Sequence, residues 1–439
     1  MKKRLAIILS ILVVAFAAIG VGLYFYFGST KAVFTKALTK SINEVFEDSP
    51  SMLRGIKYDT LKVTTKNNID VTLDKDKYSG SINGTIAYDK ATKKIISDLG
   101  IVVNKEKILD FNTLFEGSKL YFKIKDLMNT YYYLDVPVDS TSTTTIEEND
   151  IKYVKDLVQK SFFGSLKESD FTKSDEKITL DKEVSTKKIS LKLTSKRVNE
   201  ISKKVLEDIK SDKKAMSIIQ KVDKELTGES ITNYIKEIDD QAGKLSEKDY
   251  LLYTIYIVDN DNIVRHEMSA SSEEDSTINN YKLVINTYKN ASGFKTREVL
   301  FNIMNKPFVK ISMVGTSKDS SNITITSDVI SGNGTYTKNS NEESISIKLT
   351  MQGMDIGTIS MKLSKISNTE YSYSLNINAG LLSYKAAITS ENKILLNEKV
   401  TDIDVKNAKK VETMSQAEMN KIMTTIMMRV AKAFPSLMQ

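Results

Sequence analysis

The stretch KLYFKIKDL, residues 119–127, decides how this chain folds, because its apolar side chains recur at every second position. In a β-strand, Leu120, Phe122 and Ile124 would share one face, while Lys123 would point to the other. Such alternation is typical of a strand with one face buried and one face in water. The stretch therefore predicts an antiparallel sheet with two chemically different faces.

The same period of two extends from residue 56 to residue 138 and returns from residue 250 to residue 405. Asn-Gly pairs at 83–84 and 333–334 are signals of tight hairpin turns within these regions. We therefore predict two antiparallel meanders, of which the first has about six or seven strands.

Apolar side chains at helical spacing predict a stem helix at 31–48, a central helical block near 195–240 and a last helix at 415–434. A polar linker at 137–150 and a short β excursion at about 177–193 precede the central block. The chain thus alternates between β regions and helical regions.

The predicted fold class is α+β: an N-terminal transmembrane helix followed by large antiparallel meander sheets packed on helices, in the order β, helical block, β, helix. We divide the chain into four parts. They are a cytoplasmic stub and anchor at 1–28, a stem helix and first β-meander at 29–136, a linker with a β excursion and helical block at 137–245, and a second β-meander with the C-terminal helix at 246–439.

The last helix carries a methionine-rich stripe that fits a soft-metal site, a membrane-surface helix or the cover of an apolar core. Ser415 and Glu418 have the spacing of a capping box, and Pro435 ends the helix. Isoleucine and valine interleave the methionines, and no His or Cys lies nearby in the sequence, which favours the core. The candidate cavity-lining residues of this helix and of the central block are Met419, Met423, Ile426, Val430, Val205 and Ile209.

The N-terminus combines three basic residues with the uncharged run Leu5–Phe27. As a helix this run is about 34 Å long, enough to cross a hydrocarbon core of about 30 Å. The positive flank predicts a single-pass protein of the cell membrane, with the N-terminus in the cytoplasm, the body outside, and Leu5 to Phe27 in contact with the lipid bilayer. The alternative is a signal peptide cleaved after the small-residue pattern at 15–17.

Composition excludes several kinds of chemistry. The chain has 439 residues, no cysteine and one histidine, so thiol catalysis and Cys-based zinc sites are ruled out. His266 lies in a strand pattern and is interpreted as a structural residue. The net charge of +7 is spread thinly without a basic stripe, which predicts no nucleic-acid partner. We expect no catalytic residues, no cofactor and no metal site; the acidic runs at 74–80 and 259–262 are predicted to be turns.

Two stretches carry a family resemblance: FEGSKLYFKIKDL at 115–127 and KKISLKLTSKRVNEISKKVLEDIKSD at 187–212. With the N-terminal run, they resemble uncharacterised, N-terminally anchored exported proteins of low-GC Gram-positive bacteria. At the level of the fold, a long sheet wrapped on helices is similar to lipoprotein and lipid carriers of the LolA and LppX type. That resemblance implies acyl chains held between sheet and helices. This chain departs from the lipidated members because it has no cysteine.

The sequence therefore predicts a membrane-anchored, extracytoplasmic protein without enzymatic activity, which binds or carries a lipid-like ligand between sheet and helices. Adaptable methionine side chains suit a variable apolar cavity. The alternative is a cell-envelope structural or protein-interaction module, for which an exposed apolar patch without an internal cavity would speak. An enzyme is the least favoured function.

Overall fold

The computed structural model describes residues 29–48, 58–136, 148–222, 226–242, 247–272, 281–304 and 306–435. The chain divides into two compact units that are each discontinuous in sequence. Unit 1 comprises Met1–Ser51 and Thr141–Gly315, and unit 2 comprises Met52–Ser140 and Thr316–Gln439.

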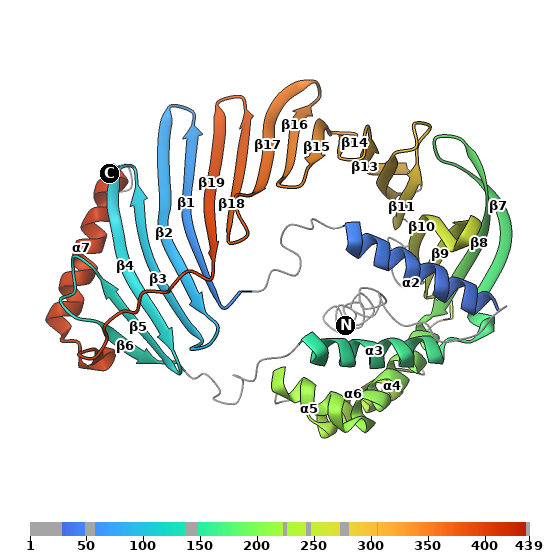
Figure 1. Cartoon of the computed structure of the whole chain (residues 1–439), viewed down its shortest axis with the longest axis horizontal. Coiled ribbons are helices and arrows are strands. Elements are labelled where there is room, and N and C mark those ends of the chain that lie inside the picture. Colours follow the sequence, from blue (N-terminus) through green and yellow to red (C-terminus); the bar gives the residue numbers. More distant parts are fainter. Residues whose placement is uncertain are drawn as a thin grey trace. The chain divides into compact units, whose positions relative to one another are not determined.

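Unit 1 is a seven-stranded antiparallel meander with helices against one of its ends (Figure 1). Each strand pairs with the next along the chain, so that the order is β7-β8-β9-β10-β11-β12-β13. The strands are β7 Phe171–Thr179, β8 Glu183–Thr194, β9 Tyr250–Val258, β10 Asn262–Ser271, β11 Tyr281–Lys289, β12 Lys295–Ile303 and β13 Lys306–Gly315. The helices are α2 Thr30–Asp48, α3 Glu148–Ser165, α4 Ser195–Ser211, α5 Lys213–Val222 and α6 Gly228–Ala242, with the short 3₁₀ turns η1 Glu168–Asp170 and η2 Asp259–Asp261.

The core of unit 1 lies between its helices and the strands β7 to β10. Phe34 of α2, Ile189 of β8 and Ile255 of β9 are fully buried, and Ile201 of α4 is 2% exposed. Phe34 packs edge-on against the ring of Phe171 at 5.2 Å. Side chains fill this interior, so the space between sheet and helices in unit 1 is a packed core.

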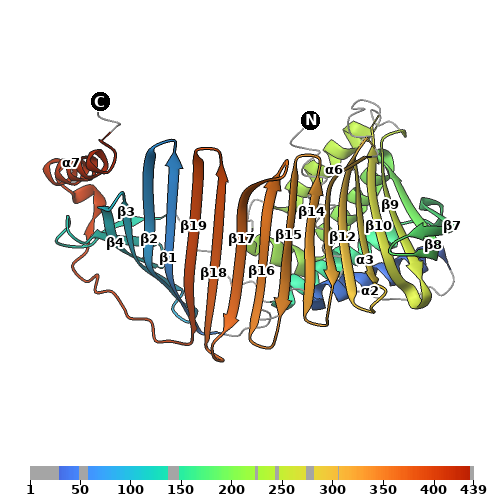
Figure 2. The same cartoon turned by 90° about the horizontal axis from the view of Figure 1, so that it is seen from above.

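Unit 2 is a longer array of strands, and β1, its first strand in the sequence, lies in the middle of that array (Figure 2). β1 pairs with β2 on one side and with β19 on the other, which gives the order β14-β15-β16-β17-β18-β19-β1-β2-β3-β4-β5-β6, all antiparallel. The first half comprises β1 Thr60–Leu73, β2 Asp76–Asp89, β3 Lys94–Val103, β4 Glu106–Glu116, β5 Lys119–Ile124 and β6 Tyr132–Asp135. The second half comprises β14 Ser320–Ser327, β15 Ile330–Lys338, β16 Glu342–Met351, β17 Met354–Lys365, β18 Glu370–Leu381 and β19 Tyr384–Leu396. The short β20, Lys409–Lys410, pairs in parallel with β6 and leads through η4, Val411–Thr413, to α7, Gln416–Ala433.

The register of unit 2 sorts its side chains into two ladders on opposite faces. Side chains directly opposite one another in neighbouring antiparallel strands lie on the same face. One face carries a row of isoleucines that we call the isoleucine ladder. Its members, one each from β16, β17, β18, β19 and β1, are Ile347, Ile359, Ile377, Ile388 and Ile69. The other face carries a row of polar residues that we call the polar ladder, each next in sequence to the isoleucine ladder where the two rows share a strand. Its members, in the strand order β15, β16, β17, β18, β19, β1 and β2, are Thr335, Ser346, Ser360, Asn376, Thr389, Asn68 and Ser81.

Helix α7 packs against the end of unit 2 formed by β4 to β6, and its C-terminal end also reaches β2. Ser415 caps it and forms the predicted capping box with Glu418. Ile422 is 8% exposed and packs with Met128 and Tyr132. At the other end of the helix, the ring of Phe434 lies 6.1 Å from that of Tyr78. Apart from this contact, the apolar strands of unit 2 beyond β4 to β6 have no helix of the described part of unit 2 packed on them.

The predicted α+β class is wrong. The described residues contain 20 strands and few helices, so strands dominate both units. The amphipathic helices were expected to cover large sheets, but they pack on β7 to β10 in unit 1 and on the β4 to β6 end in unit 2. The periodicity identified strands and helices locally but overestimated how much sheet the helices cover.

Within the described ranges, no helix is both long enough and apolar enough to cross a membrane. The run Leu5–Phe27, to which the sequence assigned the anchor, lies outside the described residues. The described structure is dominated by strands rather than being an α+β fold with a transmembrane helix, and the single-pass, cell-membrane localisation is withdrawn together with that fold class.

Candidate functional site

A polar cleft of about 730 Å³ lies between α3 and α4 of unit 1. Convergent titratable side chains in a cleft are the usual mark of an active site. The cleft is lined by Leu157, Lys160, Ser161, Gly164, Ser165, Arg197, Glu200, Lys204, Asp208, Ser211 and Asp212.

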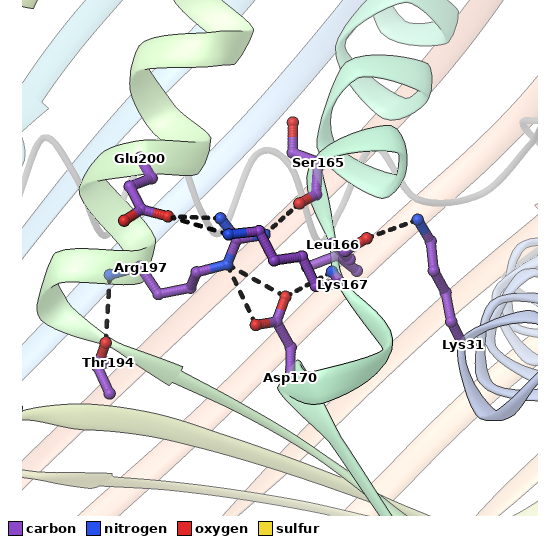
Figure 3. Close-up of polar contacts among 8 residues, drawn as sticks. All are labelled: Lys31, Ser165, Leu166, Lys167, Asp170, Thr194, Arg197 and Glu200. Carbon is purple, nitrogen blue, oxygen red and sulfur yellow. Dashed lines mark hydrogen bonds and ion pairs between the residues drawn. The ribbon is translucent and has the colours of Figure 1, made fainter.

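Arg197, on the first turn of α4, is the centre of the polar contacts at this cleft (Figure 3). Its Nε donates to both carboxylate oxygens of Asp170, at 3.1 and 3.2 Å, and one terminal nitrogen donates to Glu200 at 2.7 Å. The other terminal nitrogen donates to the carbonyl of Ser165 at the end of α3. The side chains of Arg197 and Asp170 are only 13% and 8% exposed. Arg197 thus joins α3, η1 and α4 with every guanidinium nitrogen engaged.

The remaining carboxylates of the cleft are also partnered. Asp208 accepts from Ser161 at 2.6 Å and from Lys204. Burial opposes its ionisation, but these hydrogen bonds outweigh it and hold the pKa of Asp208 below its usual range. Asp212 accepts from the Tyr153 hydroxyl at 2.8 Å and from the amide of Ala215 at 2.8 Å, at the start of α5. These contacts are those of helix caps and helix–helix ties, so we interpret the cleft as a structural junction.

The single histidine lies inside the sheet of unit 1 rather than at the cleft. His266 of β10 is directly opposite Ile255 of β9 and Ile285 of β11. Its Nδ1 is 2.8 Å from the hydroxyl of Tyr253, and burial lowers the pKa of His266 to about 4. Burial also raises the pKa of Tyr253, so a protonated phenol and a neutral imidazole share this hydrogen bond. The histidine is thus buried within a strand, the place that its sequence pattern predicted.

Three of the six predicted cavity-lining residues pack in two separate clusters, and the other three are exposed. Val205 is buried in the core of unit 1, where Ile209 packs against it. Ile426 packs in the cluster under α7, while Met419 and Met423 are 42% and 49% exposed. Val430 is 36% exposed. Isoleucine rather than methionine therefore makes the packed face of α7, and the packed stripe is narrower than the sequence suggested.

The sequence reasoning missed the apolar face of unit 2 as a candidate binding surface. We define this face as the surface of β18, β19, β1, β2 and β3 that lies on the same side of the sheet as the isoleucine ladder. Outside the ladder its members include Leu61, Val63, Val71, Ile82, Ile86, Ile95, Leu99, Ile101, Leu375 and Ile394. On these described strands, from Tyr78 onward in β2, no residue of the face is Asp, Glu, Lys or Arg.

Much of this face is open to solvent. Ile69, Ile82, Ile86 and Ile95 are between 41% and 47% exposed, and Ile388 is 37% exposed. The opposite face of the same strands carries charges at 62, 66, 70, 391 and 393, among others. Monomeric soluble proteins rarely expose contiguous apolar surface unless it binds something. The alternation of apolar and polar residues in the sequence indicates an apolar face on each strand. Only the pairing of the strands shows that these faces join into one surface.

No family model matches the chain, and no curated protein matches it in sequence. Solved structures with a weak likeness include the translocator domain of the autotransporter NalP from Neisseria meningitidis, at 7% identity, 82% coverage of this chain, 97% of that chain and a TM-score of 0.19. A porin-like protein from Bacteroides uniformis has 8% identity, coverages of 78% and 97%, and a TM-score of 0.21. The outer membrane protein Omp33 from Acinetobacter baumannii has 7% identity, coverages of 78% and 100%, and a TM-score of 0.17. Likeness this weak carries no argument, so the site is interpreted from its own geometry.

Replacing Arg197 by Ala should destabilise unit 1 by about 3 kcal/mol, because it leaves Asp170 buried without its partner and the Ser165 carbonyl without its donor. The matched control is Lys177→Ala, whose ion pair with Glu183 is 66% and 65% exposed and should contribute less than about 1 kcal/mol. Urea unfolding, followed by hydrogen exchange in α3 and α4, measures both. Equal effects of the two substitutions would contradict the structural role of Arg197.

The lowered pKa of His266 predicts a pH dependence of stability. Between about pH 6.5 and pH 4 the unfolded chain binds a proton that the folded protein excludes, so stability falls as the pH falls through this range. The loss should reach as much as about 3 kcal/mol. We expect His266→Gln to lack this part of the pH dependence in urea titrations at pH 7, 5.5 and 4. Parallel curves for the two proteins would show that His266 titrates normally.

Proposed function

We propose that this protein is a non-enzymatic binding protein that holds an apolar, chain-like ligand on the apolar face of unit 2. The observation that supports this most directly is the isoleucine ladder, an uncharged row that crosses neighbouring strands and stays partly exposed. The site differs from the one expected between sheet and helices, because in unit 1 that space is filled by core side chains.

The dimensions of the ladder suit a long acyl chain. Neighbouring strands lie about 4.8 Å apart, so the isoleucines from β16 to β1 span about 19 Å. An alkyl chain laid across them would gain about 0.8 kcal/mol for each methylene group removed from water. Branched side chains are stiff at χ1, so they present a surface that loses little entropy when covered.

A protein partner is the second candidate, because exposed apolar surface also marks protein–protein interfaces. Energetically dominant interface residues are enriched in Trp, Tyr and Arg. The chain has no tryptophan, and the apolar face has no arginine. It does carry the tyrosines Tyr78, Tyr88, Tyr371, Tyr373 and Tyr384, but they are fewer than its isoleucines. The dominance of isoleucine therefore favours an acyl chain over a folded protein.

Ile388→Glu should lower the affinity for an apolar ligand by about tenfold or more, because a carboxylate in the ladder has to be desolvated when the ligand covers it. The matched control is Thr389→Glu, the next residue, which lies on the polar face. Titration with the fluorescent probe N-phenyl-1-naphthylamine and native mass spectrometry of lipid retained during purification measure the effect.

We expect the wild-type protein and Thr389→Glu to bind the probe alike and Ile388→Glu to bind it weakly. A wild-type protein that binds no probe and retains no lipid would refute ligand binding at this face. Self-association of such a protein, abolished by Ile388→Glu, would support the protein-interaction alternative instead.

A further inference from the structure

A small polar cluster interrupts the apolar face of unit 2 in its middle. Thr65 and Asn67 of β1 lie directly opposite Asn392 and Ser390 of β19, so all four share the face of the isoleucine ladder. We call these four residues the polar island. The next pair along the strands, Ile69 and Ile388 of the ladder, borders it on one side.

Uncharged residues border the island on its other sides, and all are apolar or small except Tyr373, which lies opposite Asn392. Val63 and Ile394 form the next pair along β1 and β19 in the other direction. Across the strands, Ile82 is opposite Asn67 and Leu375 is opposite Ser390. The island is thus a group of uncharged hydrogen-bonding side chains enclosed by a face without charges.

The internal hydrogen bonds of the island leave part of its bonding capacity free. Asn67 Nδ2 donates to Thr65 Oγ1 at 2.7 Å, and Asn392 Nδ2 donates to Ser390 Oγ at 2.8 Å. Both hydroxyls act as acceptors in these bonds, so each keeps a proton to donate. The side-chain carbonyls of Asn67 and Asn392 keep lone pairs that accept. The island therefore offers donors and acceptors within a few ångströms of each other.

We propose that the polar island receives an uncharged polar group of the bound ligand, and that the ligand class is an acyl chain bearing an ester or hydroxyl group. This inference rests on the proposed function and specifies its ligand. An ester accepts from the two hydroxyls, and a hydroxyl both donates and accepts, so either matches the free capacity. A carboxylate lacks a cationic partner on this face, because Lys62, Lys66 and Lys393 lie on the opposite one.

The island sets a preference because a polar site rejects ligands that leave its groups unpaired. When an alkyl chain without a polar group covers the island, hydroxyl and amide groups lose water and gain no partner. The same cost arises for the ligand when the island is replaced by apolar residues. Selectivity between two ligands with alkyl chains of equal length, one with a polar group and one without, therefore reports on the island. Binding of either ligand reports on the isoleucine ladder.

The test compares displacement of N-phenyl-1-naphthylamine from the full-length protein by monooleoylglycerol, oleate and 1-octadecene. We expect the wild-type protein to bind monooleoylglycerol about tenfold more tightly than either of the others. The double variant Thr65→Val with Asn67→Leu should lose this preference while still binding 1-octadecene. The matched control, Thr64→Val with Asn68→Leu, changes the same residue types on the opposite face and should keep the preference.

The conservative single variant Thr65→Val serves as a second probe that changes little volume, and it should reduce the preference in part. Equal binding of monooleoylglycerol and 1-octadecene by the wild-type protein would overturn the island proposal and leave ligand binding by the ladder intact. Tighter binding of oleate than of monooleoylglycerol would overturn the uncharged ligand class. Failure of all three compounds to displace the probe, or of the probe to bind, would overturn the proposed function itself.

Discussion

The antiparallel pairing of β1 with β19 is the constraint on which unit 2 depends. It runs from Leu61 opposite Leu396 to Thr72 opposite Lys385 and joins segments that are far apart in the sequence. A side-chain hydrogen bond of 3.2 Å between Asn68 and Thr389 bridges a separation of 321 residues on the polar face. Without this pairing the two halves of unit 2 would be separate meanders, and neither ladder would be continuous.

The same register determines the chemistry of both faces. Because side chains alternate with a period of two, a slip of one residue between β1 and β19 would place isoleucines among serines and threonines on the polar face. A glycine allows a close approach between two other strands of the array, β2 and β3. Gly84 of β2 has φ +152°, and a Cβ there would lie 1.9 Å from the carbonyl oxygen of Asp98 on β3. Strand register, close backbone approach and face chemistry therefore agree with one another.

Most local elements could be predicted from the sequence, but their partners could not. The Asn-Gly pairs at 83–84 and 333–334, predicted to be hairpin turns, lie inside β2 and β15. Residues 119–127 do begin with a strand, β5, and Ser415 and Glu418 do cap α7. Periodicity tells which side chains share a face of one strand, but it does not tell which distant strand lies alongside. For that reason the sequence showed Ile69 and Ile388 as separate apolar positions, and the candidate site was sought on α7 instead. There the packed residue is Ile422, while Met423 remains exposed.

Disulfide trapping tests the pairing of β1 with β19 most directly, and the absence of cysteine from the chain makes every engineered thiol unique. Directly opposite residues have Cα atoms about 4.5–5.5 Å apart, within the range that a disulfide spans. Asn68→Cys with Thr389→Cys, or the adjacent pair Asn67→Cys with Ser390→Cys, should cross-link under mild oxidation and shift mobility on a non-reducing gel. Asn68→Cys with Ile388→Cys places the thiols on opposite faces and should stay reduced. Cross-linking of this last pair, with neither opposite pair forming a disulfide, would contradict the register and the two ladders built on it.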